Sequence, residues 1–406
     1  MLYDIHELQR SFLAPLAAFS GSSAQLFTHP YSPWAYTPVS KQLAASYELL
    51  HRLGKEYEKP QWDIHSIEKD GKTIEIQDKV VHSLPFCNLV HFERKNLTAK
   101  EPTVLIVAPL SGHHATLLRD TVRSMLIDHN VYITDWIDAR MVPLSAGPFH
   151  LNDYVRYVEQ FLEFLGKDVH VVAVCQPTVP VLAAVSLMSA RKSPYVPKSL
   201  ILMGGPVDTR ESPTQVNRLA TTKPYSWFEN NLIHRVPARY PGAGRRVYPG
   251  FLQYIGFVAM NPDRHMSSHY EFYNHLIKGQ DDSAEAHRRF YDEYNAVLDM
   301  PAEFYLDTIK IVFQEHALPK GTWEIDGELV NPAAITKTAL FTIEGELDDI
   351  SGLNQTRAAQ RLCANLAEDK KQHHTALGSG HYGIFSGRRW RNHIYPLVKD
   401  FIYQHA

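Results

Sequence analysis

The sequence has few cysteines and no long apolar run. Cys87, Cys175 and Cys363 are its three cysteines in 406 residues, and so sparse and odd a set argues against a disulfide framework and is typical of a reducing compartment. No stretch reaches the roughly 18 apolar residues that a membrane-spanning helix needs. The N-terminus has interspersed charges and lacks the unbroken apolar core of a secretory signal. We therefore expect a cytoplasmic protein without a transmembrane segment.

The sequence also lacks a strong excess of either charge. Its formal net charge is -3, and 21% of its residues are charged. It contains no basic stripe and no basic cluster interleaved with aromatic residues, so nothing indicates a nucleic-acid partner. Hydrophobic residues make up 44% of the chain, which is enough for a sizeable core and argues against disorder.

Internal repeats and low-complexity segments are absent as well, and residues 1–60 have a helical pattern. An apolar stripe at spacings of three and four predicts a first helix, and its members are Leu2, Ile5, Leu8, Phe12, Leu16 and Phe19. Pro15 is expected to kink or split this helix. We expect the stripe to pack on its own domain, with a surface-binding helix as the alternative. A second helix is predicted at 41–53.

Strands and helices alternate through residues 61–210. The first strands, 73–77 and 89–92, are expected to form an antiparallel pair. Further strands are predicted at 103–110, 131–136, 169–174 and 200–204, with helices at 115–128, 151–165 and 178–190 between them. The run Thr103–Leu110 is almost continuously apolar, as in a strand buried on both faces. This alternation predicts an α/β fold with a mostly parallel sheet and flanking helices.

The alternation stops at residues 211–335, which are irregular and helical and include a predicted helix at 283–298. It resumes in 336–406, with strands at 338–343 and 372–376 and helices at 353–367 and from 395 to the end. We therefore expect a helical cap, 211–335, inserted between two late strands of one α/β domain. Such a cap lies over the carboxyl ends of the strands, where open α/β sheets bind ligands.

Cys175 is the candidate nucleophile. A buried strand leads directly into it and a helix begins at once, in the order expected of a nucleophile elbow. The usual elbow reads G-x-S-x-G, but here the flanking positions are Ala173 and Pro177. The positive end of the following helix favours a thiolate. The alternative is that Cys175 is a small buried hydrophobe, as free cysteines commonly are.

The partners of a nucleophile in this type of fold follow in the order acid, then histidine. Asp348 comes after the strand TALFTIEG, and His381 lies in the glycine-rich loop GSGHYG. An aspartate there can fix the tautomer of the imidazole, and Asp349 is the competing candidate. The pairs His113-His114 and His373-His374 lack tight metal-ligand spacing, so we expect no metal and no cofactor.

The oxyanion hole is expected to consist of two backbone N–H groups. Gln176 directly follows the nucleophile and supplies the first. Ser111, in the segment PLSGHH after the strand at 103–110, is expected to supply the second, with Gly112 giving the backbone room. Such donors stabilise a tetrahedral oxyanion by about 2.7–4 kcal/mol each.

The segments AVCQPTVPVLAA, EGELDDISG, GSGHYGIF and YELLHRLGKEYEKP resemble the intracellular poly(3-hydroxybutyrate) depolymerases of bacteria. The resemblance extends over nearly the whole chain and implies an α/β-hydrolase fold. It also implies a cysteine nucleophile at Cys175, partners Asp348 and His381, and action on polyester granules in the cytoplasm.

Several alternatives remain open. A polyhydroxyalkanoate synthase uses the same residue types but usually keeps a glycine two positions after the cysteine, where this chain has Pro177. Another acyltransferase, a thioesterase or a lipase of the same fold, or a non-catalytic granule-binding protein, are further readings. Coenzyme A could replace water as acyl acceptor. A homo-oligomer is also left open.

Overall fold

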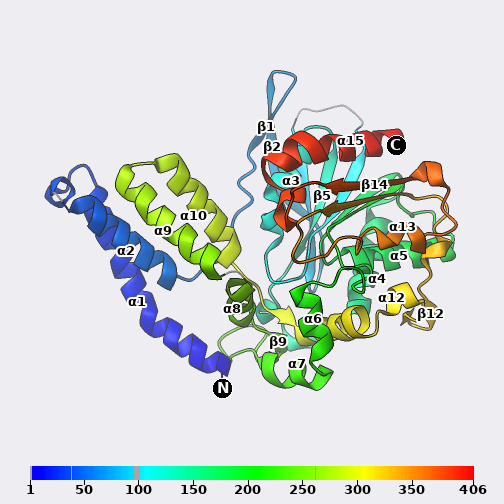
Figure 1. Ribbon diagram of the computed structural model, residues 1–406, viewed down its shortest axis with the longest axis horizontal. Helices are drawn as coiled ribbons and strands as arrows, with labels where there is room; N and C mark the ends of the chain where they lie inside the picture. Colours follow the sequence, from blue (N-terminus) through cyan, green and yellow to red (C-terminus); the bar gives the residue numbers. More distant parts are fainter. Residues whose placement is uncertain (1, 38, 96–100, 261) are drawn as a thin grey trace.

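The computed structural model describes residues 2–37, 39–95, 101–260 and 262–406. Over these ranges, nine strands form one sheet with the order β1-β2-β3-β5-β4-β6-β7-β13-β14 (Figure 1). The strands are β1 (Ser66–Lys69), β2 (Lys72–Leu84), β3 (Cys87–Arg94), β4 (Thr103–Val107), β5 (Asn130–Trp136), β6 (Val169–Val174), β7 (Ser199–Met203), β13 (Ala339–Gly345) and β14 (Lys371–Ala376).

The six strands from β5 to β14 are parallel, and β3 is antiparallel to both of its neighbours. If β1 is left aside and the other eight strands are numbered along the chain, their order across the sheet is 1-2-4-3-5-6-7-8. Every residue of β6 and β7 is buried, because helices cover both faces of the parallel part. The protein has the α/β-hydrolase fold, as the sequence predicted.

The helices around the sheet pack mainly through apolar faces. They are α3 (Arg119–Met125), α4 (Leu151–Leu165), α5 (Thr178–Ala190), α13 (Ala358–Leu362), α14 (Gly387–Arg389) and α15 (Tyr395–Gln404). Helix α5 is apolar on all sides and buried from Thr178 to Met188, which is the pattern of a central helix held between the sheet and other elements. It begins where β6 ends, so its position fixes the turn between them.

The chain between β7 and β13 forms a long, mostly helical insertion. Its elements are α6 (Gln215–Thr222), α7 (Tyr225–Leu232), β8 (His234–Arg235), β9 (Arg246–Tyr248), α8 (Gly250–Met260), α9 (Pro262–Lys278), α10 (Asp281–Asn295), β10 (Met300–Pro301), α11 (Ala302–Asp307), α12 (Ala317–Lys320), β11 (Glu324–Ile325) and β12 (Glu328–Leu329). Short 3₁₀ and π segments complete the fold: η1 (Pro33–Tyr36), η2 (Ala115–Leu118), η3 (Ala139–Met141), η4 (Leu144–Ala146), η5 (Thr308–Gln314), η6 (Pro332–Ala334), η7 (Glu368–Lys370), η8 (His381–Ile384) and η9 (Trp390–Ile394).

An arm of four helices projects from the side of this domain (Figure 1). It combines the N-terminal helices α1 (Leu2–Thr28) and α2 (Ser40–Gly54) with α9 and α10 of the insertion. Ion pairs hold the two halves together: Arg288 binds Glu48 at 2.6 Å, and Arg52 binds Asp292 at 2.9 Å. These ion pairs attach the N-terminal helices to the insertion.

The structure corrects two expectations about the first helix. Pro15 does not split it: helix α1 continues through Pro15, because losing one backbone bond does not prevent a helix that is supported by packing on α2. The apolar stripe does not pack on its own domain. Phe12 is 74% exposed and Phe19 63% exposed, and the buried positions of α1 include the small residues Ala17, Ser20 and Ser23.

Two predicted helices are shorter than expected. The segment 115–128 divides into η2 and α3, and the helix predicted at 353–367 is reduced to α13. In the second case, the buried carboxylate of Glu344 accepts hydrogen bonds from the backbone N–H groups of Asn354 at 3.0 Å and Arg357 at 2.8 Å. These bonds hold the residues before α13 in turns. Across the described ranges, no helix is both long enough and apolar enough to cross a membrane.

Candidate active site

Cys175 lies at the sharp turn between β6 and α5. Its φ angle is 68°, a left-handed conformation that costs a non-glycine residue about 1–2 kcal/mol. The turn is held from both sides, since the Cys175 N–H donates to the Met203 carbonyl at 2.7 Å and the Cys175 carbonyl accepts from Thr178 N–H at 3.1 Å. The residue is half-buried, with part of its surface open to solvent. Backbone strain of this kind is typical of functional positions.

Two glycines at the end of the neighbouring strand give this turn its space. A Cβ on Gly205 would lie 1.8 Å from Thr178 Oγ1 and 2.4 Å from the Cys175 carbonyl oxygen. Gly204 has a φ of 57°, and a Cβ there would lie 2.6 Å from the Ile384 side chain. Glycines usually flank the nucleophile of an elbow in sequence, but they are absent here. The two glycines after β7 instead let this segment approach the turn closely. Sequence reasoning missed this role, although the adjacent glycines after an apolar strand are a visible signal.

Asp348 is buried in the loop after β13, with its side chain only 1% exposed. One carboxylate oxygen accepts hydrogen bonds from the backbone N–H groups of Ile350 and Ser351, both at 2.9 Å. The other oxygen is 2.7 Å from Nδ1 of His381. Asp349, the competing candidate, is exposed to solvent. The carboxylate is thus fixed by the backbone and turned toward the imidazole.

His381 follows β14 and is itself buried. Its loop is tied to the loop of Asp348 by backbone hydrogen bonds from Leu347 N–H to the Ser379 carbonyl at 2.9 Å and from Glu346 N–H to the Ala376 carbonyl at 3.1 Å. Since β6, β7, β13 and β14 are consecutive neighbours in the parallel sheet, their carboxyl ends meet along one edge. The loops that carry Cys175, Asp348 and His381 all start from that edge.

Opposing effects act on the pKa of His381. Burial alone lowers it, but the Cys175 sulfur and the Asp348 carboxylate raise the pKa well above its usual value, each through charge and a hydrogen bond. The structure therefore brings the predicted trio together: a sulfur and a carboxylate act on one buried imidazole. Such an arrangement has the order in which a nucleophile, a base and an orienting acid act.

The backbone N–H groups of Gln176 and Ser111 lie on two segments joined by a side-chain contact. The Gln176 side-chain oxygen accepts a hydrogen bond from the backbone N–H of Leu110 at 3.4 Å. This contact connects the elbow with the loop after β4, in which Ser111 is the next residue. Within the described part of the chain, no protein acceptor binds either N–H group. Both donors are thus available to an external oxygen atom.

The insertion covers this loop directly. Gly112 has a φ of 112°, and a Cβ there would lie 2.6 Å from the Gln253 side-chain oxygen of α8. The Gly112 carbonyl accepts a hydrogen bond from Leu298 N–H at 2.7 Å. His113 stacks on Phe257 of α8 with ring centroids 4.8 Å apart, and burial lowers its pKa to about 4. Elements of the insertion therefore border the cysteine side of the site.

The other two cysteines lie elsewhere in the fold. Cys87 and Cys363 are buried, and burial raises the pKa of each thiol. Neither thiol is therefore suited to act as a nucleophile. Among the residues with described placement, no group of three or more histidine, cysteine, aspartate or glutamate side chains has the arrangement of a metal site.

The comparison with known families bears on the half of the chain that holds Asp348 and His381. The sequence profile described as "PHB de-polymerase C-terminus" matches residues 204–406, half of the chain. The chain belongs to this PHB depolymerase family. It is an ester hydrolase of that family. Cys175 precedes the matched region, so the family assignment does not extend to Cys175.

Solved structures similar to this PHB depolymerase family member include several hydrolases. A putative lipase from Acinetobacter baumannii AYE is 14% identical, over 81% of this chain and 93% of the other, with a TM-score of 0.43. The 2-hydroxy-6-oxo-6-phenylhexa-2,4-dienoate hydrolase of Rhodococcus sp. strain RHA1 is 15% identical, over 82% and 100% of the two chains, with a TM-score of 0.46. An esterase from Thermogutta terrifontis is 11% identical, over 82% and 100%, with a TM-score of 0.41. The comparison with curated proteins gave no match.

Proposed function

We propose that this chain is an intracellular depolymerase of poly(3-hydroxybutyrate), with Cys175 as nucleophile, His381 as acid and base, and Asp348 as the group that orients His381. The observation that carries the proposal is the left-handed Cys175 at the end of β6, whose sulfur acts on an imidazole that is bound to a buried carboxylate. Membership of the PHB depolymerase family supplies the substrate class. The proposed location is the cytoplasm, at the surface of polyester granules.

The first half of the reaction forms a thioester. The Cys175 thiolate attacks the carbonyl carbon of a 3-hydroxybutyrate ester, and the carbonyl oxygen becomes an oxyanion. The N–H groups of Gln176 and Ser111 are proposed to stabilise it. When the tetrahedral intermediate collapses, the carbon–oxygen ester bond breaks. The leaving alkoxide takes the proton of His381 and departs as the new hydroxyl end of the polymer.

The second half of the reaction releases the acyl group. His381, now neutral, takes a proton from a water molecule whose oxygen attacks the thioester carbonyl. The carbon–sulfur bond breaks, the 3-hydroxybutyrate unit leaves as an acid, and the proton on His381 restores the thiolate–imidazolium pair. Asp348 keeps Nδ1 of the ring protonated throughout, so Nε2 is the nitrogen that exchanges protons. The thiol of coenzyme A is chemically able to take the place of water.

The experiment that tests this function measures soluble 3-hydroxybutyrate released from native amorphous granules. We expect wild type to release it, and Cys175→Ala to lower the rate by at least about 1,000-fold, because the residual activity of an enzyme that loses its nucleophile is small. Cys175→Ser is expected to be strongly impaired as well, because a serine hydroxyl is not ionised by His381 as a thiol is.

Asp349→Asn is the matched control for Asp348→Asn, because both change an aspartate of the same loop and only Asp348 contacts His381. Full granule hydrolysis by Cys175→Ala would refute the proposal. Formation of polymer from 3-hydroxybutyryl-CoA, without release of soluble product from granules, would instead identify a synthase. Adding coenzyme A to the granule assay shows whether the acyl group leaves as a free acid or as a thioester.

A further inference from the structure

We propose that one face of helix α1 is a docking surface for the uncharged polyester of the granule, an inference that rests on the proposed function. The apolar face of α1 consists of Leu8, Phe12, Leu13, Leu16 and Phe19, all of which are exposed. Large exposed apolar side chains in a contiguous row are uncommon on a soluble monomer and mark an interaction site. The stripe that the sequence predicted to be core is instead turned to the outside.

The packing of α1 on α2 explains why this face is free. The two helices meet through small side chains, with Ala17 and Ser20 of α1 buried and Ala44 and Ala45 of α2 buried as well. Small residues let two helices approach closely without using their large apolar side chains. At the edge of the apolar face, Phe19 and Phe27 contact the ring of Tyr47 of α2. The hairpin is therefore folded so that its largest apolar groups remain outside.

The turn between α1 and α2 extends the same chemistry to the tip of the arm. Tyr31 is 92% exposed there, and Trp34 and Tyr36 are also exposed. Tyrosine and tryptophan are suited to a surface with an apolar body and polar acceptors, and a polyester presents methyl groups and ester carbonyls together. The apolar face of α1 and the aromatic tip thus form one extended surface along the arm.

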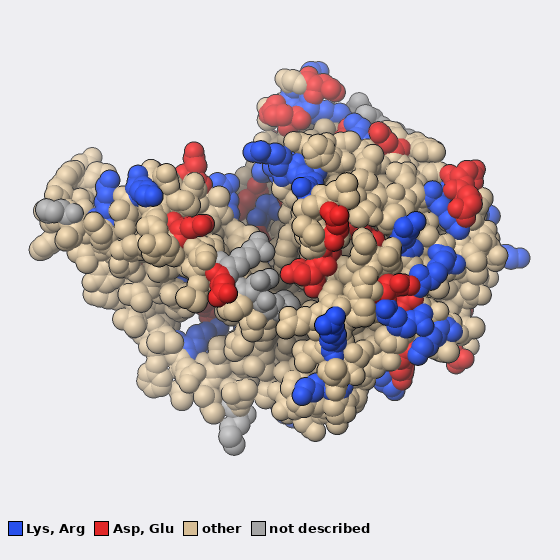
Figure 2. Space-filling model, in the orientation of Figure 1, with Lys and Arg blue, Asp and Glu red and all other residues tan. Residues whose placement is uncertain are grey.

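The lack of charged residues on this surface indicates what kind of partner it binds. Residues 11–40 contain no aspartate, glutamate, lysine or arginine, and Figure 2 shows the lower-left edge of the arm, where α1 lies, almost without charged atoms. Helices that lie on anionic membranes are rich in lysine and arginine on their polar face, and nucleic acids likewise require basic residues. A neutral water-insoluble ester polymer requires neither. The missing charge therefore favours the granule over an anionic lipid surface.

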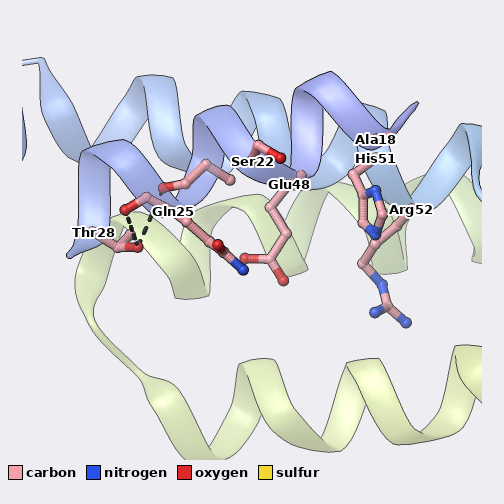
Figure 3. Close-up of a pocket in the computed structure, with 9 residues that line it drawn as sticks. Ala18, Ser22, Gln25, Thr28, Glu48, His51 and Arg52 are labelled. Atoms are coloured by element: carbon pink, nitrogen blue, oxygen red, sulfur yellow. Dashed lines mark hydrogen bonds between the residues drawn. The ribbon is translucent and has the colours of Figure 1, made fainter. Parts of the chain in front are cut away.

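The inner side of the arm has the opposite character. A groove of about 490 Å³ is lined by residues of α1 and α2, namely Gln25, Glu48, His51 and Arg52 together with small residues of α1 (Figure 3). Glu48 and Arg52 are ion-paired with Arg288 and Asp292 of α10. The polar side of the arm is thus used for internal contacts. The outer side remains for an external partner.

The place of the arm in the molecule agrees with this role. At its base, Tyr3 and His6 of α1 contact Phe251 of α8, and the same helix packs over the loop that carries Ser111 and Gly112. The docking surface and the candidate active site are therefore connected through one helix of the insertion. A protein that cleaves a solid substrate needs to stay at its surface between cleavage events, and the arm would provide that adsorption.

The test compares binding to native amorphous granules by co-sedimentation in a Cys175→Ala background, so that binding is measured without cleavage. The variant Phe12→Gln, Leu16→Gln, Phe19→Gln is expected to weaken granule binding by about 100-fold. Glutamine keeps the helix propensity of α1 close to that of leucine. The control is Phe164→Gln, Leu219→Gln, Leu329→Gln, which changes three exposed apolar residues outside the arm and should bind as the parent does.

Folding and function are checked separately. With Cys175 restored, the Phe12, Leu16 and Phe19 variant should cleave a soluble short-chain ester at the wild-type rate. The single change Phe12→Gln, at the position that is 74% exposed, should already weaken binding. Unchanged granule binding by the triple variant would overturn the docking proposal. So would equal binding of the parent to vesicles of phosphatidylglycerol and phosphatidylcholine, or a wild-type dimer that the triple variant converts to a monomer. Absence of granule hydrolysis by wild type would overturn the proposed function instead.

Discussion

At His381, burial and charge act in opposite directions on one imidazole. Burial favours the neutral ring, whereas Cys175 and Asp348 favour the protonated ring and raise its pKa well above the usual value. A ring that stays protonated at neutral pH can give its proton to a leaving alkoxide. The proposed chemistry thus depends on the balance of three side chains rather than on Cys175 alone.

We predict that Cys175→Ala lowers the pKa of His381, because it removes both a negative charge and a hydrogen-bond partner of the imidazolium. Asp348→Asn should lower this pKa as well, for the same electrostatic reason. An NMR titration of the His381 ring measures both effects. In wild type, hydrolysis of a soluble ester should fall only at a pH above the ordinary histidine range, where the imidazolium loses its proton.

The exposed neighbour Asp349 provides the control for this titration. Asp349→Asn changes the same charge one residue away but makes no contact with the ring, so the pKa of His381 should stay close to that of wild type. A His381 pKa that is unchanged in Cys175→Ala would contradict the thiolate–imidazolium pair, and with it the assignment of Cys175 as nucleophile.

At the scale of elements, the turn from β6 to α5 depends on the end of β7. The left-handed Cys175 is possible because Gly204 and Gly205 follow β7, and their missing side chains leave room for Thr178 and Ile384. The conformation of this turn thus depends on two neighbouring strands, and a substitution after β7 is expected to displace the turn after β6. Strain at a functional turn persists only when the surroundings fix it in this way.

We predict that Gly205→Ala lowers the free energy of unfolding by about 3 kcal/mol, because its methyl group would overlap Thr178 and the Cys175 carbonyl oxygen. Displacement of the nucleophile should lower the turnover of a soluble ester by about 100-fold. Denaturant unfolding and steady-state kinetics measure the two effects. Gly256→Ala is the matched control: apart from the adjacent backbone of its own helix, nothing lies within 4 Å of the new methyl group, and a helical alanine should raise stability by about 0.5–1 kcal/mol. Equal stability of the two variants would contradict this account of the turn.

At the scale of the whole molecule, a buried acidic pair joins the arm, the insertion and the sheet. Asp138 follows β5 and Asp299 precedes β10. The Asp299 N–H donates to the Asp138 carboxylate at 3.2 Å, while Tyr3 of α1 donates to the Asp299 carboxylate at 2.6 Å. Gly250, the first residue of α8, also donates to Asp299 at 2.8 Å. Three parts of the chain therefore meet at two carboxylates.

Burial and the charge of Asp299 raise the pKa of Asp138 to about 7, and Arg140 offsets part of this. The folded-state pKa thus lies above the unfolded value of 3.8. Its contribution to stability is fully present below that unfolded pKa and is lost as pH rises through about 7. The protein should therefore lose stability from this group between pH 4 and 7.

We predict that Asp138→Asn removes this loss. The stability of wild type relative to Asp138→Asn should fall by roughly 4 kcal/mol between pH 4 and 8, which urea unfolding at a series of pH values measures. Comparing one protein with the other removes the opposite contribution of buried neutral histidines such as His113. If the unfolding free energies of the two proteins change in parallel with pH over this range, Asp138 does not titrate as the buried pair requires.

The sequence by itself determined most of the α/β-hydrolase core. Strands β5, β6 and β13, and helices α4 and α5, follow from apolar runs and helical periodicity, because both faces of a parallel sheet are buried and its strands read as continuous apolar segments. Local order also determined the candidates Cys175, Asp348 and His381, because each comes within a few residues of the end of a predicted strand. Parallel strands bring their carboxyl ends to one edge of the sheet.

Tertiary structure alone decided what local patterns leave open. An apolar stripe has the same spacing whether it meets a core or a granule, and only the small residues between α1 and α2 show that this one faces outward. Likewise, the truncation of the helix at 353–367 depends on Glu344, a residue of β13 whose carboxylate binds backbone N–H groups far along the chain. The space for Cys175 comes from the two glycines that follow the neighbouring strand, β7. These outcomes depend on contacts between distant segments, which periodicity within one segment does not encode.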